Sequence, residues 1–392
     1  MSEKIAIITG GTGGHIFPAR TTAENLVNKG FKAVILGDRK YQKYHKDSDN
    51  FKYKIISSSS LKSGVFGLLL TSIKISLGIL QSLIWMFLNR PKVVVAFGGY
   101  ATFPVLLSAV ILKKKIILHE QNAHLGKVNR FFIKYADFVA LTYNQTDGIE
   151  NCYLAKTKYV GNPVRLKIAE LSKNEYQLPD FEIEEKPVND FGYDVLLASQ
   201  FENYKQQQAV ESFNILIIGG SGGAKIFSDV LPKAFFNVRD EVKSCIKITQ
   251  QCRAELIQYT FDQYHSFNIS VEISNFFDDM EERIQKAHLV IARSGSSSIA
   301  EFTAAKKPMI LVPFARAADN HQEKNAKFIE QKGGAIVIKE EDFTINKITN
   351  CIENLIDNPA LLLKMSKASF ASAELGATDN LVKLIKEIIE VK

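Results

Sequence analysis

The strongest constraint on the fold is a nine-residue motif that occurs twice in the chain. Residues 6–14 read AIITGGTGG and residues 215–223 read ILIIGGSGG, at a fixed offset of 209 residues. Each copy is an apolar run that leads into a glycine-rich turn and then into a helix-like stretch. A strand, a glycine loop and a helix in this order are typical of α/β domains that bind phosphate groups. The repeat therefore predicts two Rossmann-like domains, each opening with its own glycine loop.

Short β-branched runs alternate with helix-length segments along both halves of the chain. Continuous apolar strands of this kind indicate parallel sheets that are covered on both faces, which is the doubly wound α/β architecture. We expect strands at 4–9, 32–36, 52–56, 92–97, 115–119 and 137–142 in the first half, and at 214–218, 245–249, 270–273, 288–292, 309–313 and 335–338 in the second.

Length and local composition set the expected domain boundaries. A chain of 392 residues is too long for one ordinary core. We assign residues 1–166 to the first domain and residues 212–376 to the second. Residues 167–211 lack periodicity and carry many Glu, Lys, Gln and Tyr, so we interpret them as a linker with an irregular insertion. The C-terminal stretch 377–392 forms an amphipathic helix that we expect to cross back onto the first domain.

Charge is divided unevenly between the two halves. Residues 1–165 hold 23 Lys and Arg against 9 Asp and Glu, whereas the remainder holds 26 against 33. A basic half joined to an acidic half suggests that the first domain meets an anionic partner. Nucleic acid, phospholipid and a pyrophosphate substrate all qualify, and a solvated lysine-rich surface is the alternative.

Cysteine usage and the first residues bear on the cellular compartment. The four cysteines are scattered without a C-x-x-C pair, which is typical of reduced packing residues rather than of a disulfide frame or a zinc site. A strand-like apolar run begins at Ile5 and leads straight into glycines, unlike a signal peptide. We expect a cytoplasmic protein.

Residues 64–88 are unusually apolar and long enough to span a bilayer. A spanning helix here would put the strands before and after it on opposite sides of the membrane and so divide one sheet, and we therefore reject a span. The segment ends in Trp85, Met86, Phe87 and Leu88, with Lys and Arg residues nearby. This pattern favours peripheral contact with the membrane interface, and a fully buried core helix is the alternative.

The first glycine loop, residues 10–14, is a candidate anion site. Glycines after a strand let backbone N–H groups approach an anion, and the following helix adds its positive end. The loop is no P-loop, and it fits G-x-G-x-x-G poorly because Ile16 stands at the last glycine position. A tight turn without a ligand is the alternative. His15 directly follows this loop. At that position it could act as a base or hydrogen-bond a phosphate, although an isolated histidine is more often structural.

Three further motifs follow strands of the first half. The stretch 97–104 (FGGYATFP), which includes Tyr100, predicts a second backbone cradle at the same sheet edge. The stretch 119–122 (HEQN) places four polar residues at the carboxyl end of an apolar strand. Arg165 ends the stretch 161–165 (GNPVR) and offers a guanidinium suited to phosphate.

In the second half, residues 292–301 (ARSGSSSIAE) follow a predicted strand. We expect the serines to cap a helix and, with its N-terminus, to suit a diphosphate. Glu301 lies within two turns, placed to accept hydrogen bonds from ribose hydroxyls, and plain capping by a Ser and Glu pair is the alternative. The stretch 312–322 follows another strand and brings His321 and Gln322 toward the same site.

A metal site is not expected. Asp47 and Asp49 formally match the Asp-x-Asp of many sugar transferases, but they lie in a polar loop that precedes a strand, so a solvated turn is favoured. Elsewhere the sequence has no carboxylate cluster with ligand spacing. We therefore expect no metal and no other cofactor, with a diphosphate met by backbone amides, helix dipoles and Arg165.

Taken in order, these motifs resemble those of the MurG family of inverting glycosyltransferases. The matching stretches are 10–19 (GGTGGHIFPA), 97–104, 118–122, 161–165, 219–224 (GGSGGA), 276–280 (FFDDM), 293–301 and 319–326 (DNHQEKNA). The resemblance implies the GT-B fold, in which a cleft separates two Rossmann-like domains. It also implies transfer of N-acetylglucosamine (GlcNAc) from UDP-GlcNAc to the C4 hydroxyl of undecaprenyl-pyrophosphoryl-MurNAc-pentapeptide in peptidoglycan synthesis, converting lipid I to lipid II.

The resemblance also implies partners and a location. UDP-GlcNAc and the lipid-linked acceptor are the expected small-molecule partners, and an anionic membrane surface and other cell-wall enzymes are the expected larger ones; nucleic acid is not. The expected location is peripheral, on the cytoplasmic face of the cell membrane.

Site residues are carried over position by position. The resemblance implies that Thr12, Gly13, Gly14 and His15 face the acceptor pyrophosphate and the transferred sugar. It also places Asn122 and Arg165 at the cleft. The UDP-GlcNAc site would comprise Ser221, Phe277, Ser296, Ser297, Ser298, Ile299, Ala300, Glu301 and Gln322. There the backbone of Phe277 would pair with uracil and Glu301 would hold the ribose. The expected base is His15, with His119 or Glu120 as the second choice.

The sequence departs from the family pattern in places, and two rivals stay open. Three serines, 296–298, stand where the family usually has Ala-x-Thr, and the insertion at 167–211 is longer than usual. One rival is a UDP-sugar epimerase of similar two-domain fold, which would not need the apolar 64–88 face. The other is a non-catalytic, membrane-associated partner subunit. A dinucleotide-dependent oxidoreductase is disfavoured by the poor G-x-G-x-x-G match.

Overall fold

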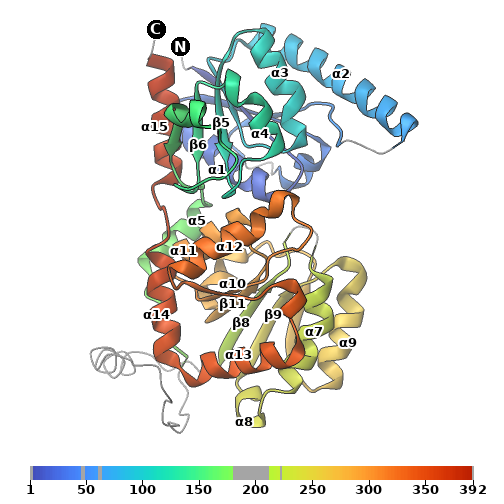
Figure 1. Cartoon of the computed structure of the whole chain (residues 1–392), viewed down its shortest axis with the longest axis vertical. Coiled ribbons are helices and arrows are strands. Elements are labelled where there is room, and N and C mark those ends of the chain that lie inside the picture. The colour runs from blue at the N-terminus through green and yellow to red at the C-terminus, as the bar shows by residue number, and fades with distance from the viewer. Residues whose placement is uncertain (1–2, 46–48, 61–63, 180–211, 221–222, 391–392) are drawn as a thin grey trace. The chain divides into compact units, whose positions relative to one another are not determined.

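The computed structural model describes residues 3–45, 49–60, 64–179, 212–220 and 223–390. The chain divides into two compact units, Met1–Leu166 with Glu374–Lys392, and Lys167–Ala373. Each unit is built on one parallel sheet (Figure 1). All twelve predicted strands are present, which confirms the α/β architecture.

The sheet of the first unit has the order β3-β2-β1-β4-β5-β6-β7. Its strands are β1 (Lys4–Thr9), β2 (Lys32–Gly37), β3 (Lys52–Ile55), β4 (Val93–Ala96), β5 (Lys115–Glu120), β6 (Phe138–Leu141) and β7 (Thr157–Tyr159). Among the strands of the described residues, the short edge strand β7 is the one that the sequence did not predict, because its three residues are largely exposed and lack an apolar run.

Alternate residues of these strands pack on opposite faces of the sheet, as expected for a pleated strand that is covered on both sides. Ile5 and Ile7 contact α1 (Gly13–Asn28) and α15 (Ala377–Glu390), whereas Ala6 and Ile8 belong to a second core with α3 (Phe103–Ile111) and α4 (Lys127–Phe132). The C-terminal helix α15 therefore packs beside α1 in the first unit (Figure 1).

The sheet of the second unit has the order β10-β9-β8-β11-β12-β13. Its strands are β8 (Phe213–Ile218), β9 (Ile246–Gln251), β10 (Val271–Ser274), β11 (Leu289–Ala292), β12 (Met309–Leu311) and β13 (Ala335–Val337). Its helices are α5 (Leu166–Glu170), which begins at the unit boundary, α7 (Lys225–Phe236), α8 (Asp240–Lys243), α9 (Ile257–Ser266), α10 (Met280–Lys286), α11 (Ser296–Ala304), α12 (His321–Gln331), α13 (Ile345–Asp357) and α14 (Pro359–Phe370).

The segment that we interpreted as a linker starts later than expected. Residues 167–179 belong to the second unit, where the buried Tyr176 hydroxyl donates a hydrogen bond to the His288 carbonyl at 2.8 Å. A buried tyrosine with a paired hydroxyl makes this stretch part of a core. The rest of the predicted linker, 180–211, lies outside the described residues.

Helix α2 (Val65–Asn89) covers the apolar segment 64–88. Only a narrow stripe of small or flexible residues, Thr71, Gly78, Ser82 and Met86, is buried, and α2 packs there on α3. Gly78 is required by this packing, since a β-carbon there would lie 1.9 Å from the Ser57 carbonyl oxygen. By length and composition α2 could cross a membrane. Only 17% of its most apolar window is buried, so α2 is not a core helix.

The strands that flank α2 belong to one sheet, in which β1 pairs directly with both β2 and β4. A membrane-spanning α2 would require parts of this sheet to lie on opposite sides of the bilayer. The topology therefore supports the rejection of a span.

Candidate active site

In each unit the strand order reverses at one point, between β1 and β4 in the first and between β8 and β11 in the second. In doubly wound sheets, ligands bind beyond the carboxyl ends of the strands at such a switch point. The glycine loops at residues 10–14 and 219–223 follow β1 and β8, and thus each repeat copy stands at its own switch point. The predicted site residues are described below within each unit.

At the first switch point, the loops after β1 and β4 approach each other closely. A β-carbon at Gly99 would lie 3.2 Å from the Gly10 carbonyl oxygen, and both Gly98 and Gly99 have positive φ. Helix α1 begins at Gly13 with Thr12 as its N-cap, whose side chain makes no capping bond. Thr12, Gly13 and Gly14 therefore present the first-turn backbone toward the sheet edge, as an anion site requires.

Tyr100 lies over this loop. A β-carbon at Gly11 would meet the Tyr100 ring at 3.5 Å, and the Tyr100 hydroxyl donates a hydrogen bond to Asp38 Oδ2 at 2.9 Å. Burial, together with this bond to the carboxylate, raises the pKa of Tyr100 to about 12. Tyr100 is thus a neutral hydrogen-bonding group that Asp38 holds in place, and Asp38 is a residue that the sequence did not single out.

His15, in the first turn of α1, is joined to the end of β5 by a chain of hydrogen bonds. His15 Nδ1 lies 2.9 Å from Gln121 Oε1, and Gln121 Nε2 lies 2.9 Å from His119 Nδ1. His119 Nε2 in turn lies 3.0 Å from the Gly161 carbonyl oxygen. His119 is fully buried and stacked on Phe97, and burial lowers its pKa to about 4. Gln121, which the sequence did not single out, connects the two histidines.

Glu120, our second choice of base, is engaged otherwise. Its carboxylate is buried and accepts four hydrogen bonds, at 2.8–3.2 Å, from the Asn122 N–H, Asn122 Nδ2, the Gly126 N–H and Asn129 Nδ2. Four donors from the segment that follows β5 occupy the two carboxylate oxygens, so the side chain is already engaged in holding that segment. The geometry favours His15 over Glu120 as the base, and Glu120 as the residue that holds the loop after β5.

Asn122 and Arg165 lie in the same unit. Asn122 is held by Glu120, as described above, at the carboxyl end of β5. The Arg165 guanidinium lies 4.8 Å from the ring centroid of Phe17 in α1, and a β-carbon at Gly13 would lie 3.2 Å from this ring. Arg165 is therefore brought to the opening of α1, where an anionic group would meet both the guanidinium and the helix N-terminus.

At the second switch point, α11 begins at Ser296, and its N-cap is Gly295, which has no side chain to form a capping bond. This corrects the expectation that the serines cap the helix, because Ser296, Ser297 and Ser298 form its first turn instead. Their backbone N–H groups lie at the positive end of the helix dipole. Within this helix Ile299 and Glu301 are buried and Ala300 is half-buried. Ser221 lies outside the described residues.

Gln322 is tied to the loop that starts α11. The Ser294 hydroxyl donates to the Gln322 carbonyl at 2.8 Å, and Asn325 Nδ2 donates to the Ser294 carbonyl at 3.1 Å. The Gln322 side-chain oxygen accepts from the Phe314 N–H at 3.0 Å. The structure thus brings Gln322 and the Ser296–Glu301 turn together, as predicted.

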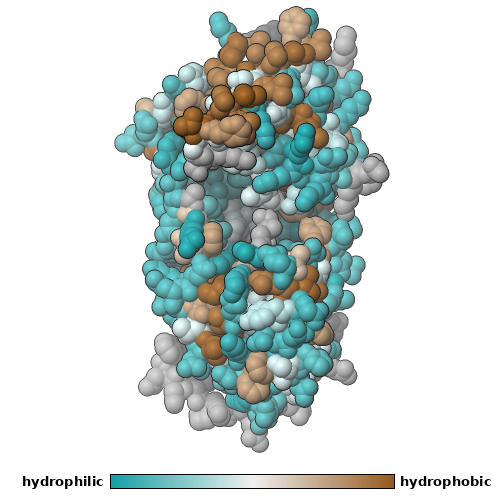
Figure 2. Space-filling view, turned by 90° about the vertical axis from the view of Figure 1, so that its right-hand side faces the viewer, coloured by the Kyte–Doolittle hydropathy of each residue, from teal (hydrophilic) through white to brown (hydrophobic). Residues whose placement is uncertain are grey.

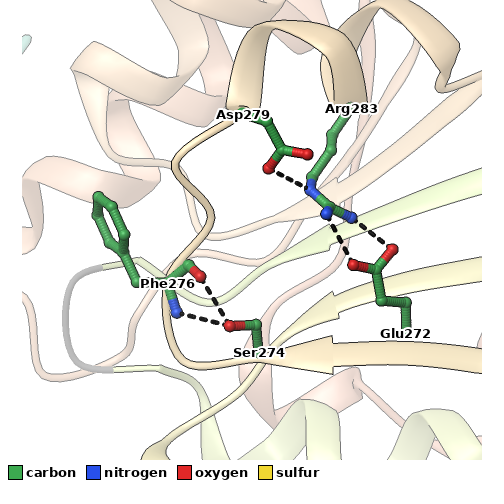
Figure 3. Close-up of polar contacts among 5 residues, drawn as sticks. All are labelled: Glu272, Ser274, Phe276, Asp279 and Arg283. Carbon is green, nitrogen blue, oxygen red and sulfur yellow. Dashed lines mark hydrogen bonds and ion pairs between the residues drawn. The ribbon is translucent and has the colours of Figure 1, made fainter.

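The loop after β10 carries Phe276 and Phe277, and Arg283 from α10 holds it. The Arg283 guanidinium donates hydrogen bonds to both carboxylate oxygens of Glu272, at 2.6 and 2.7 Å, and to Asp279 Oδ1 at 2.8 Å (Figure 3). These bonds lower the pKa of both carboxyls. The guanidinium also lies 4.0 Å from the centroid of the buried Phe277 ring. Phe277 can therefore offer a ligand its backbone, while its ring is packed.

The structure also bears on a metal. Within the described parts of the chain, no group of three or more His, Cys, Asp or Glu could hold an ion. Asp49 is already paired, with Arg20 at 2.5 Å and with His45 Nδ1 at 2.9 Å, while Asp47 lies outside the described residues. Absence of a cofactor remains a prediction.

Two doubly wound units, each with a glycine loop at its switch point, make up the GT-B fold, and matches to two family models identify the class of protein as a glycosyltransferase. Residues 5–141 match the glycosyltransferase family 28 N-terminal domain, and residues 214–381 match the C-terminal domain of that family. A Wolbachia sp. (subsp. Drosophila simulans) protein named UDP-N-acetylglucosamine--N-acetylmuramyl-(pentapeptide) pyrophosphoryl-undecaprenol N-acetylglucosamine transferase is 35% identical over 97% of this chain and 98% of its own. This chain belongs to the MurG family within glycosyltransferase family 28.

Solved structures agree with this fold. The crystal structure of Acinetobacter baumannii MurG matches with a TM-score of 0.71 and 24% identity, covering 98% of this chain and 99% of the other. A Listeria monocytogenes protein described as a putative UDP-N-acetylglucosamine 2-epimerase matches with a TM-score of 0.65 and 12% identity, covering 100% and 98%. At these identities both likenesses concern the fold alone.

Proposed function

We propose that this chain transfers GlcNAc from UDP-GlcNAc to the C4 hydroxyl of lipid-linked MurNAc-pentapeptide, converting lipid I to lipid II in peptidoglycan synthesis. The observation that carries the proposal is the match along nearly the full chain to a relative named for this transfer. The two switch-point sites support it, because each holds the residue types that one of the two substrates requires.

The second unit suits the donor. Backbone N–H groups in the first turn of α11, at Ser296–Ser298, would bind the diphosphate, aided by the helix dipole. Glu301, one turn further along and buried, would accept hydrogen bonds from the ribose hydroxyls. The backbone of Phe277 would pair with uracil, and Gln322 would contact the sugar. Stabilising the departing diphosphate is the main electrostatic task in this reaction.

The first unit suits the acceptor and the base. The acceptor hydroxyl oxygen forms a bond to the anomeric carbon while the bond from that carbon to UDP breaks, so the configuration inverts from α to β. UDP leaves with the bonding electrons, and the hydroxyl proton passes to His15. The N-terminus of α1 and Arg165 would meet the acceptor pyrophosphate, and we propose that neither a metal nor another cofactor is needed.

The test supplies purified chain with labelled UDP-GlcNAc and the lipid-linked acceptor, with and without EDTA. Transfer of label to the lipid in both conditions is expected. Conversion of UDP-GlcNAc without acceptor would identify the epimerase rival instead, and no turnover despite UDP-GlcNAc binding would favour the non-catalytic subunit. Loss of transfer on chelation, with recovery on adding a divalent ion, would overturn the cofactor proposal.

Glu301→Ala tests the donor assignment. The KM for UDP-GlcNAc should rise about 10- to 100-fold, because a hydrogen bond to a charged group contributes about 1.5–3 kcal/mol. Steady-state kinetics at saturating acceptor measure this, and kcat should change little because the contact is far from the reacting carbon. Glu255→Ala, at an exposed site in the same unit, is the control. An unchanged KM would remove Glu301 from the donor site.

We also propose peripheral contact with an anionic membrane through α2. Its exposed face carries large apolar side chains that are 56–73% exposed, among them Phe66, Leu69, Ile73, Leu80 and Phe87. Figure 2 shows apolar residues gathered in one large patch on this part of the surface. Exposed Lys74 and Arg90 on or beside the helix would meet anionic head groups.

The double variant Leu69→Glu/Leu80→Glu tests this contact. Its partition onto phosphatidylglycerol vesicles should fall by more than about tenfold, because each buried leucine contributes about 1.5–3 kcal/mol. Vesicle co-sedimentation measures the bound fraction. Tyr259→Glu, at a site 43% exposed in the second unit, should bind like the wild type. Equal vesicle binding by the α2 variant and the wild type would contradict the proposed membrane contact.

A further inference from the structure

We propose that Gln121 is a positioning residue that fixes the tautomer of His15, so that Nε2 of the neutral ring carries the lone pair that takes the acceptor proton. The inference rests on the proposed function, since it assigns a role to the base of that reaction. It concerns a buried amide, 2% exposed, that touches both histidines of the first unit.

The donor and acceptor roles along this chain of hydrogen bonds can be assigned starting from the Gly161 carbonyl. A backbone carbonyl oxygen can only accept, so His119 Nε2, 3.0 Å away, must carry a hydrogen. His119 is fully buried, and its burial lowers its pKa to about 4, so the ring holds a single proton near neutral pH. Its Nδ1 is therefore an acceptor.

This acceptor determines how the Gln121 amide is oriented. The amide nitrogen must face His119 Nδ1, at 2.9 Å, and it lies 3.2 Å from the His119 carbonyl, which also only accepts. Both contacts therefore require the nitrogen on this side. The amide oxygen is then left to face His15 Nδ1, at 2.9 Å, and an oxygen without hydrogen requires that Nδ1 donates. In neutral His15 the remaining nitrogen, Nε2, has no hydrogen.

The Nε2 edge of His15 faces the glycine loop after β4. A β-carbon at Gly99 would lie 3.5 Å from Nε2 and 3.3 Å from Cδ2, and a β-carbon at Gly98 would lie 3.7 Å from Cε1. Because both positions are glycine, side chains at 98 and 99 do not cover this edge of the ring. The lone pair is thus directed to the switch point at which the acceptor is expected to bind.

Glutamine is suited to this place because it donates at one end and accepts at the other. A leucine would contact both rings without bonding either, and His15 could then rotate or take the tautomer with hydrogen on Nε2. A base in the wrong tautomer is held in place but cannot accept the proton, and such changes lower turnover rather than binding. The His119 ring, stacked on Phe97 with centroids 4.9 Å apart, keeps the far end of the chain rigid.

Two measurements on the full chain test the inference. In enzyme labelled with ¹⁵N-histidine, long-range ¹H–¹⁵N spectra report which ring nitrogen is protonated, and the spectrum of His15→Gln identifies the His15 signals. Wild-type His15 should show the tautomer with hydrogen on Nδ1. In Gln121→Leu the signal should move toward the other tautomer, and kcat should fall about 10- to 100-fold with the KM for UDP-GlcNAc unchanged.

Gln250→Leu is the matched control, because Gln250 is also fully buried and its side-chain oxygen accepts from Tyr264 at 2.7 Å. It should leave the His15 signals and kcat as they are in the wild type. Wild-type His15 with hydrogen on Nε2, or Gln121→Leu with normal kcat and an unchanged His15 tautomer, would overturn the inference. The spectra need no substrate, so failure of the proposed transfer would be seen separately, as a wild-type enzyme without activity.

Discussion

Replacement of His15 by alanine should lower kcat by about 10²- to 10⁴-fold, the range that a positioned general base contributes. The physical reason is that the acceptor hydroxyl is a poor nucleophile unless its proton is removed as the new bond forms. His15 stands in the first turn of α1, at the loop after β4, and Gln121 bonds its other nitrogen. The measurement is kcat at saturating concentrations of both substrates.

Binding should be affected far less than turnover. In the proposed mechanism the imidazole acts on the reacting hydroxyl, so its main effect would lie in the transition state, and the KM for UDP-GlcNAc should stay close to that of the wild type. His265→Ala, at an exposed site on α9, is the control and should have wild-type kcat. A His15→Ala enzyme with kcat within about threefold of wild type would exclude general-base catalysis by this residue.

The sequence predicted the strands well, because the apolar run that marks a buried parallel strand is a local feature of the sequence. Runs such as Ile5–Ile8 and Val93–Ala96 are apolar throughout, as a strand covered on both faces requires. The two glycine loops were found in the same way, since each directly follows its strand. Strand β7 was missed because it lies at an edge, where exposure removes the apolar signal.

The candidate site was predicted less completely, because its bonds join residues that are far apart in the chain. Gln121 and His15 are separated by 106 positions, and Asp38 and Tyr100 by 62. Only the strand order, with β2 beside β1, β1 beside β4 and β4 beside β5, brings these residues to one sheet edge. The HEQN stretch did indicate a polar cluster after β5, but its side chains alone did not reveal that Glu120 stabilises a loop while Gln121 connects two histidines.

The exposure of α2 likewise depends on packing that its sequence does not show. A helix of 25 mostly apolar residues suits a core, a membrane span and an interface equally well. The outcome follows from Gly78 and Ser82, which allow a close approach along one narrow stripe and leave the rest of the helix uncovered.

Removal of the Glu120 carboxylate should have the second large effect, on stability rather than on chemistry. In Glu120→Ala the Asn122 N–H, the Gly126 N–H and the Asn129 amide lose their acceptor. A buried donor without a partner costs about 1–3 kcal/mol, so the free energy of unfolding of the first unit should fall by several kcal/mol. Urea denaturation followed by fluorescence and circular dichroism measures this change.

Two further variants separate a loop-holding role from a catalytic one. Glu120→Gln keeps one acceptor oxygen but turns an amide nitrogen toward two of the donors, so its stability should lie between those of Glu120→Ala and the wild type. Glu150→Ala, at an exposed site of the same unit, should be as stable as the wild type. If Glu120→Ala had wild-type stability and yet lost turnover as fully as His15→Ala, the carboxylate would have to act on the substrate. The four hydrogen bonds at 2.8–3.2 Å lead us to expect the opposite result, a destabilised enzyme whose folded fraction still turns over.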